Sequence, residues 1–159
     1  MSKTTRATQA LDRAGIPYSV HLYAYDPHAE SIGLQAAESL GAEPQTVLKT
    51  LMAQVDGKPV CVVVPSDREV SMKRLAAAFA GKQAQMMRPA DAERVTGYHV
   101  GGISPFGQKK PVPTAIEIAA LEHESVFVNG GQRGLQVRLR PSDARDGLQA
   151  RAAPLVTDG

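Results

Sequence analysis

The chain has 159 residues, of which 43% are hydrophobic and 21% charged, a composition that predicts one soluble globular domain with a sizeable core. A net charge of +2 is too small for a protein that coats duplex nucleic acid, although it is compatible with a partner contacted at a few phosphates. The absence of Trp and the small number of Phe and Tyr argue against an aromatic platform for single strands. No apolar run approaches the ~20 residues that span a bilayer, the N-terminus lacks the apolar core of a signal peptide, and a single cysteine gives no intramolecular disulfide. We therefore expect a cytoplasmic protein with no membrane association.

Apolar spacing and turn residues predict alternating helices and strands in the first two thirds of the chain. The apolar run at 60–64 does not alternate, so we expect that strand to be covered on both sides. In chain order the predicted elements are a helix at about 3–14, a strand at 16–25, a helix at 33–41, a β-hairpin of 47–55 and 59–65, a helix at 71–79 with Ser71 as N-cap, a strand near 83–87 and a helix from Pro89 to Thr96.

The last third of the chain continues this mixture after an irregular segment at 98–111. The elements predicted there are a strand at 113–118, a hairpin of 125–129 and 135–140 around NGGQRG with Leu135, Val137 and Leu139 facing inward, and a helix at 141–150. We see no internal repeat and no linker. The pattern predicts a single compact domain over residues 1–159, of the α/β or α+β class, around a mixed sheet.

The stretch VLKTLM at 47–52 places a charge within an otherwise apolar strand. Alternation puts Lys49 on one face of that strand and Thr50 on the other. A buried ammonium is costly unless it is paired or a site uses it, so Lys49 is a candidate functional residue. If Lys49 lines a pocket, Thr50 can line it too only where the strand twists or bulges.

No motif in the chain identifies a metal site or a protein nucleophile. The four histidines lack the close spacing of zinc ligands, and Cys61 lies in the apolar run CVVVP, where we expect a buried thiol with a raised pKa. Ser104 is outside a G-x-S-x-G pattern, and the following Pro105 has no N–H for an oxyanion. We expect no metal and no cofactor, and we interpret Ser104 as a turn or binding hydroxyl.

The segment GGISPFGQKKPVP at 101–113 combines three glycines with three prolines. Such a stiff, glycine-lined loop can present backbone N–H groups to a ligand carbonyl or oxyanion, and the adjacent Lys109 and Lys110 could meet phosphate. The alternative is a plain ordered turn with a solvated lysine pair. The segment NGGQRG at 129–134 is an ordinary hairpin signal.

Five segments, taken together, closely resemble the YbaK family, the bacterial cysteinyl-tRNA(Pro) deacylases. They run in order through nearly the whole chain: HLYAYDP (21–27), GLQAAESLG (33–41), VLKTL (47–51), GYHVGGISPFGQKK (97–110) and NGGQRGLQV (129–137). The broader editing superfamily shares a G-x-S-P-x-G-like element, and the Gln108-Lys109-Lys110 that follows it here points to the YbaK branch.

The resemblance implies a mixed, barrel-like sheet with helices packed around it, the fold of the editing domain inserted in many bacterial prolyl-tRNA synthetases. It also implies hydrolysis, in trans, of the ester that joins a wrong amino acid to the 3′ ribose of tRNA. Prolyl-tRNA synthetase mischarges cysteine because apolar pockets discriminate poorly by size, by about 1–3 kcal/mol per methylene. In this family the substrate's own thiol attacks the ester carbonyl, a cyclic thiolactone forms and the tRNA leaves.

The resemblance also implies roles for individual residues of this chain. The family's essential lysine matches Lys49, which we expect to bind and orient the substrate. The threonine that follows this lysine in the family motif matches Thr50. The glycine backbone that holds the substrate carbonyl matches Gly101 and Gly102, and the pocket tyrosine matches Tyr23.

Three positions depart from the family pattern. Ile32 stands where an aromatic residue is frequent, Leu48 replaces the usual Phe, and Asn129 replaces a common serine. The expected substrate-binding residues are thus Tyr23, Ile32, Thr50, Ser104 and Asn129. The departures at Ile32 and Asn129 could alter the preference for cysteine.

The expected partners are the acceptor end of tRNA(Pro) and prolyl-tRNA synthetase, with a monomeric protein and modest, salt-sensitive affinity for tRNA. Two other functions remain open from the sequence. One is a deacylase for another misacylated tRNA, such as alanyl- or seryl-tRNA. The other is a module that binds tRNA or the synthetase without turnover.

Overall fold

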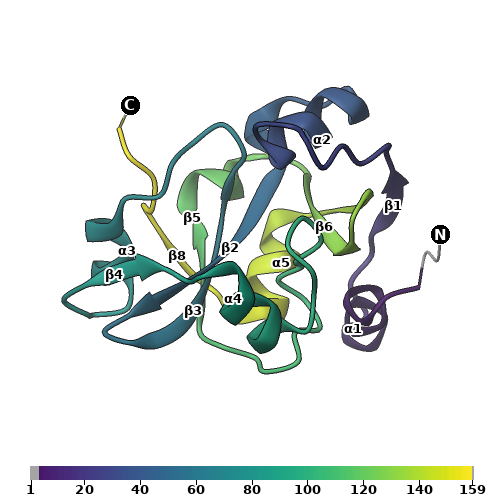
Figure 1. Cartoon of the computed structure of the whole chain (residues 1–159). Helices are drawn as coiled ribbons and strands as arrows, with labels where there is room; N and C mark the ends of the chain where they lie inside the picture. Colours follow the sequence, from purple (N-terminus) through teal and green to yellow (C-terminus); the bar gives the residue numbers. More distant parts are fainter. Residues whose placement is uncertain (1–3, 159) are drawn as a thin grey trace.

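The computed structural model describes residues 4–158, in which helices and strands alternate and the strands form two sheets (Figure 1). In chain order the elements are α1 (Arg6–Ala14), β1 (Ser19–Leu22), α2 (Ile32–Leu40), the 3-10 turn η1 (Pro44–Thr46), β2 (Leu48–Val55), β3 (Lys58–Pro65), α3 (Met72–Ala78), β4 (Ala84–Met86), α4 (Pro89–Thr96), β5 (Thr114–Glu117), the 3-10 turn η2 (Ile118–Glu122), β6 (Val126–Gln132), β7 (Leu135–Leu139), α5 (Pro141–Leu148) and β8 (Arg151–Ala153). Within the described residues no helix is long and apolar enough to cross a membrane.

The helices begin and end where local chemistry dictates. Thr5 caps α1 through its hydroxyl, which accepts the Thr8 N–H, so the helix begins at Arg6. Residue 3, from which the first helix was expected, lies outside the described residues. Ser71 caps α3 as predicted, and Gly97 ends α4 in the left-handed conformation that glycine adopts most easily.

The larger sheet has five strands in the order β4-β2-β3-β5-β8. The predicted hairpin β2–β3 is confirmed and turns at Asp56-Gly57, and β3 continues the sheet through a parallel pairing with β5. Residues 60–64 of β3 are each at most 3% exposed, which confirms that this strand is covered on both faces. A continuous apolar run is therefore the mark of the central strand of this sheet.

The smaller sheet has three strands in the order β1-β7-β6. Leu135, Val137 and Leu139 of β7 are buried as predicted. Strand β1 is shorter than the expected 16–25, because its partner β7 begins at Leu135, which pairs with Leu22. The two sheets meet at one parallel bridge between Val47 and Phe127.

The expected α/β class is confirmed, with a correction to the shape of the sheet. The described strands do not form a closed barrel, since the two sheets are joined by a single bridge and β2 keeps an open edge beyond it. Figure 1 shows α3 and β4 at one end of the molecule and β1 and α1 at the other.

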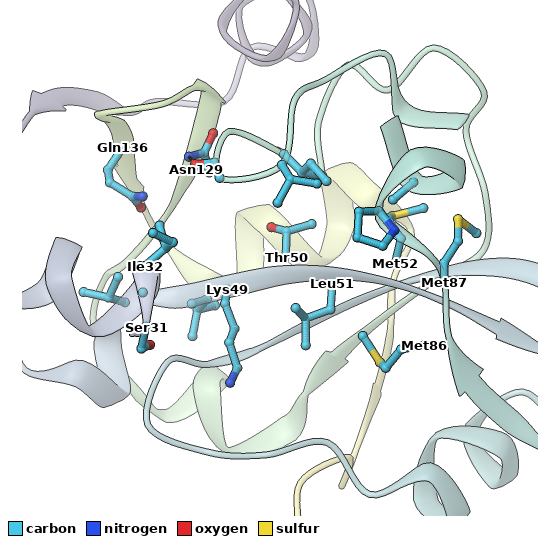
Figure 2. Close-up of a pocket in the computed structure, with 18 residues that line it drawn as sticks. Ser31, Ile32, Lys49, Thr50, Leu51, Met52, Met86, Met87, Asn129 and Gln136 are labelled. Atoms are coloured by element: carbon cyan, nitrogen blue, oxygen red, sulfur yellow. Dashed lines mark hydrogen bonds between the residues drawn. The ribbon is translucent and has the colours of Figure 1, made fainter. Parts of the chain in front are cut away.

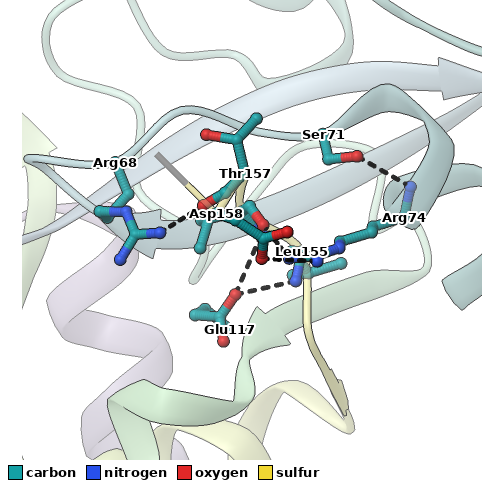
Figure 3. Close-up of polar contacts among 8 residues, drawn as sticks. Arg68, Ser71, Arg74, Glu117, Leu155, Thr157 and Asp158 are labelled. Atoms are coloured by element: carbon teal, nitrogen blue, oxygen red, sulfur yellow. Dashed lines mark hydrogen bonds and ion pairs between the residues drawn. The ribbon is translucent and has the colours of Figure 1, made fainter.

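The C-terminal segment adds a strand that the sequence did not reveal. Strand β8 pairs in parallel with β5, and Val156 bridges to Val70. Figure 3 shows the segment held by charged side chains: Arg68 donates to the Thr157 carbonyl, and Arg74 donates to the Val156 carbonyl and the Asp158 carboxylate. Contacts between distant residues position a short strand with little apolar character such as β8. Hydrophobic periodicity in the sequence does not reveal such contacts.

Glu117 anchors the same segment from inside. Its carboxylate is 4% exposed; one oxygen accepts the N–H groups of Leu155 (2.8 Å) and Val156 (3.1 Å), and the other accepts the Ala119 N–H (3.1 Å). Both carboxylate oxygens are therefore used as acceptors of backbone N–H groups, which compensates the burial of the charge.

We expect Glu117→Gln to lower the free energy of unfolding by about 1–3 kcal/mol, because either orientation of the amide turns an NH2 group toward a backbone N–H. Urea denaturation measures the effect. The matched control is Glu122→Gln, a change at an exposed carboxylate that should stay within about 0.5 kcal/mol. Equal stabilities of the two variants would contradict the anchoring role of Glu117.

Candidate active site

A cavity of about 310 Å³ opens beside the first half of β2, and we call it the β2 cavity (Figure 2). Four parts of the fold enclose it: the start of α2, strand β2, the segment from β4 to the loop after α4, and the facing strands β6 and β7. Its lining residues are Ser31, Ile32, Gly33, Val47, Leu48, Lys49, Thr50, Leu51, Met52, Met86, Met87, Pro89, Ala92, Val100, Gly101, Ile103, Asn129 and Gln136.

The β2 cavity follows the open edge of β2. On that side β2 has a bridge at Val47 and pairs with β4 only from Ala53 to Val55, so 49–51 have no strand partner there among residues 4–158. Ser66 donates to the Val47 carbonyl, which makes Val47–Ser66 a hydrogen-bonded pair of the antiparallel ladder. Alternation then turns the N–H and C=O of Thr50 away from β3 and toward the open edge.

Lys49 and Thr50 lie on opposite faces of β2, as alternation predicted (Figure 2). Both nevertheless line the β2 cavity. Of the two expected causes, a twist or a bulge, the bulge is absent, because the β2–β3 register runs without a shift from Leu48 to Val55. The cavity reaches both faces because it wraps around an edge that no neighbouring strand covers.

The Lys49 side chain is 21% exposed, and its Nζ lies 3.9 Å from an oxygen of Glu69. Glu69 is itself 87% exposed, so this is a weak, solvent-screened ion pair. The Lys49 ammonium is thus held in place only loosely and can turn to an anionic ligand. Ser31, Ile32 and Gly33 line the same cavity at the N-terminal end of α2, where the helix dipole adds positive potential.

Two polar groups on the other face of β2 are buried without partners. The Thr50 hydroxyl and the Gln136 Oε1 have no hydrogen-bond partner among the described residues, and both side chains line the β2 cavity. Buried polar atoms are almost always satisfied, so these two groups are candidates to bind water or a polar ligand in the cavity. Gln136 was missed from the sequence because its neighbours Leu135 and Val137 face inward, and alternation therefore predicted an outward Gln136.

The loop after α4 contributes Gly101 to the β2 cavity. Gly101 has φ +91°, a conformation that favours glycine, and a Cβ there would lie 2.5 Å from the Tyr25 Oη, so the Tyr25 side chain would have to move to admit another residue. A Cβ on Gly102 would lie 2.8 Å from the Arg133 N. The Gly102 N–H donates to the His99 carbonyl at 2.8 Å, whereas the Gly101 N–H has no partner within residues 4–158. Gly101 is thus the donor of the pair that remains available to a ligand.

Asn129 lines the β2 cavity but already uses its amide within the protein. Its Oδ1 accepts the N–H groups of Gly131 (2.7 Å) and Gln132 (3.2 Å), and its Nδ2 donates to the Gly101 carbonyl at 3.2 Å. The segment 129–134, predicted as an ordinary hairpin turn, therefore also holds in place the loop that contains Gly101 and Gly102, which we call the glycine loop.

The remaining predicted residues divide between the cavity and its surroundings. Ile32 lines the cavity, at the first position of α2. Tyr23 is 8% exposed beside it in a cluster with Val47 and Phe127; burial raises the pKa of its hydroxyl, and the nearby Gln136 side chain acts in the opposite direction. Ser104 does not line the cavity: it is fully buried, and its Oγ accepts the Phe106 N–H at 3.1 Å, the arrangement of a turn hydroxyl.

Cys61 behaves as predicted from its apolar context. The side chain is fully buried in the core, and burial raises the pKa of its thiol to about 12. It is therefore a small apolar core residue that remains a thiol at neutral pH. Within residues 4–158 no three His, Cys, Asp or Glu side chains gather as metal ligands.

The mixed fold places a lysine, a backbone N–H without a partner among the described residues and two side-chain amides around one cavity beside an open strand edge. The family model of the aminoacyl-tRNA editing domain matches residues 26–146, which include all of these features. The chain belongs to this family.

Individual relatives agree with that assignment. The chain is 37% identical over 142 residues, 86% of its length and 84% of the relative's, to a protein of Enterococcus faecalis named "Putative Cys-tRNA(Pro)/Cys-tRNA(Cys) deacylase EbsC". It is 35% identical over 104 residues to the proline–tRNA ligase of Maridesulfovibrio salexigens, of which it spans only 17%.

Solved structures share the fold. One is titled "Crystal structure of a putative trans-editing enzyme for prolyl tRNA synthetase" and superposes with a TM-score of 0.81 at 20% identity, covering 98% of this chain and 99% of that one. The hypothetical protein APE2540 gives a TM-score of 0.86 at 21% identity, with 96% and 100% covered. The fold expected from the sequence is thereby confirmed.

Proposed function

We propose that this chain is an aminoacyl-tRNA deacylase that edits in trans and hydrolyses Cys-tRNA(Pro). The observation that carries the proposal is the β2 cavity, which is lined by Lys49 on one face of β2, by Thr50 and Gln136 on the other, and by Gly101, whose N–H has no partner within residues 4–158. The relative from E. faecalis, similar over most of both chains, carries a deacylase name and supports the same activity.

Each group has a role that fits an aminoacyl ester. The Gly101 N–H donates to the ester carbonyl and stabilises the negative charge that develops there. The Gln136 Oε1 accepts from the substrate's α-ammonium, and the Thr50 hydroxyl and backbone bind the rest of the aminoacyl group. Lys49, beside the N-terminal end of α2, binds the phosphate or ribose oxygens of the terminal nucleotide.

The reaction needs no protein nucleophile, and the cavity lining offers none in the form of Cys, His, Asp or Glu. The substrate thiol loses its proton, and its sulfur attacks the ester carbonyl carbon. The bond between that carbon and the ribose 3′ oxygen breaks, and the oxygen takes up a proton. The products are the tRNA and a cyclic thiolactone, which water opens to cysteine. The protein's part is positioning and charge stabilisation.

We further propose that the protein acts as a monomer on tRNA(Pro), in the cytoplasm where tRNA is charged, with prolyl-tRNA synthetase as partner. The similarity to a segment of proline–tRNA ligases supports the link to that enzyme. A net charge of +2 leaves few cations for phosphate contacts, so affinity for free tRNA should be modest and salt-sensitive.

The test is hydrolysis of Cys-, Ser- and Ala-tRNA(Pro) measured side by side under single-turnover conditions. We expect Cys-tRNA(Pro) to react at least about a hundredfold faster than the other two, because its thiol is a far better intramolecular nucleophile than the Ser hydroxyl, and Ala has no such group. Comparable rates on Ser or Ala substrates would contradict the thiolactone step and identify a deacylase of broader specificity. Binding of tRNA without hydrolysis of any of the three would identify a non-catalytic binding module.

A further inference from the structure

The Gly101 N–H owes its direction to a particular turn. The Gly102 N–H donates to the His99 carbonyl, which closes a β-turn over residues 99–102. Gly101, its third residue, has φ +91°, whereas Val100 is not among the residues with positive φ. These values define a type II turn, whose central peptide is flipped relative to a type I turn. The orientation of the Val100–Gly101 peptide therefore decides where the Gly101 N–H points.

Arg133 holds this peptide by its carbonyl. The Arg133 Nε donates to the Val100 carbonyl at 2.9 Å across 33 positions of sequence. In a trans peptide the C=O and the following N–H point in opposite directions. A carbonyl fixed on Arg133, which does not line the β2 cavity, turns the Gly101 N–H away from Arg133, and we infer that it points toward the cavity that Gly101 lines.

We propose that Arg133 is a positioning residue of the deacylase: it clamps the Val100 carbonyl so that the Gly101 N–H is presented to the substrate carbonyl. The inference rests on the proposed function and adds a residue that does not itself touch the substrate.

Three further contacts make the clamp specific. The Arg133 guanidinium lies 5.4 Å from the centroid of the Tyr25 ring, and Tyr25 in turn is packed against Gly101. The backbone around Gln132 and Arg133 approaches Gly102 so closely that only glycine fits. Asn129, from the same turn, donates to the next carbonyl, that of Gly101. Consecutive carbonyls of the glycine loop are thus held by two side chains of the segment 129–134.

The chain contains a matched control for Arg133. Arg138 is also exposed, stacks on an aromatic ring (5.6 Å from the Phe127 centroid) and donates through its Nε at 2.8 Å, but its acceptor is the Ser125 hydroxyl. Replacing either arginine by alanine removes one stack and one hydrogen bond. Only the Arg133 change frees a peptide of the β2 cavity.

We expect Arg133→Ala to lower kcat for Cys-tRNA(Pro) by about tenfold to a hundredfold. KM should change little, because the carbonyl contact strengthens in the transition state. Arg138→Ala should leave kcat unchanged, with a similar melting temperature. Arg133→Lys keeps a donor but loses the planar stack, so its kcat should lie between those of wild type and Arg133→Ala. Equal kcat values for Arg133→Ala and Arg138→Ala would overturn the proposal.

A double-mutant cycle tests whether Arg133 affects kcat through the Gly101 N–H. Incorporating glycolic acid at position 101 replaces the Gly101 N–H by an ester oxygen. In that background Arg133→Ala should cost almost nothing more, since the donor that it orients is already gone. Full additivity of the two changes would contradict positioning through Gly101.

The clamp can also be judged without activity. In Arg133→Ala the ¹⁵N-labelled Gly101 amide signal should shift or broaden as the peptide samples a second orientation, and in Arg138→Ala it should not move. If the wild-type protein hydrolysed no aminoacyl-tRNA, the proposed function would fail, and this signal alone would decide the inference. An unchanged Gly101 signal in Arg133→Ala would reject it.

Discussion

Lys49→Ala is expected to slow deacylation of Cys-tRNA(Pro) by about a hundredfold to a thousandfold while leaving the fold intact. We expect a loss of activity without a loss of stability because of the surroundings of Lys49. Its partner Glu69 is exposed and 3.9 Å away, and such pairs contribute about 0–1 kcal/mol to stability. The ammonium therefore has little structural role to lose. Single-turnover hydrolysis and thermal unfolding, measured on the same preparation, check both halves of this expectation.

Three further variants show what the Lys49 cation does. Glu69→Gln should change the rate by no more than about twofold, since the ion pair is weak. Lys58→Ala, at an exposed position of the same hairpin, controls for the loss of one positive charge. Lys49→Arg keeps the charge but replaces a compact ammonium by a planar guanidinium, and we expect it to remain slow. Near-normal hydrolysis by Lys49→Ala would show that substrate binding does not depend on this cation.

The sequence predicted the elements around the active site well, because local chemistry determines them. The Asp56-Gly57 turn and the apolar run of β3 place β2, and alternation along β2 correctly puts Lys49 and Thr50 on opposite faces. That both residues line one cavity without a bulge could not be predicted from the sequence. Whether a strand has a neighbour on its second edge depends on how far β4 reaches, and that is a tertiary property.

The parts of the site that the sequence did not reveal depend on contacts between distant segments. Gln136 lies on a strand whose apolar positions all face inward, so its burial depends on what covers the second face of β7. The role of Arg133 depends on the carbonyl of Val100, which lies 33 positions earlier in the chain, in the loop after α4. Neither residue has a local pattern that would distinguish it from a surface side chain of a hairpin.

Gly101→Ala is expected to reduce deacylation by about a hundredfold or more, because it displaces the Gly101 N–H, which has no hydrogen-bond acceptor within residues 4–158 and belongs to a residue that lines the β2 cavity. Two separate causes act at this position. The φ of +91° is strained for alanine, and the new Cβ would lie 2.5 Å from the Tyr25 Oη. The Tyr25 side chain must move to make room for the methyl group, and the turn can relieve the strained φ only by changing its type. A change of turn type redirects the N–H.

Gly57→Ala separates the general cost of a strained backbone from the effect at the site. Gly57 has φ +81° in the β2–β3 turn, and no atom lies within 4 Å of a Cβ placed there. Both substitutions should lower the free energy of unfolding by about 1 kcal/mol or more, as positive φ disfavours alanine. Only Gly101→Ala should lose activity, with the loss in kcat rather than KM. If the two variants hydrolysed Cys-tRNA(Pro) equally fast, the carbonyl would have to be held by a donor other than Gly101. The Thr50 N–H at the open edge of β2 would then be the next group to test, because Thr50 lines the same cavity.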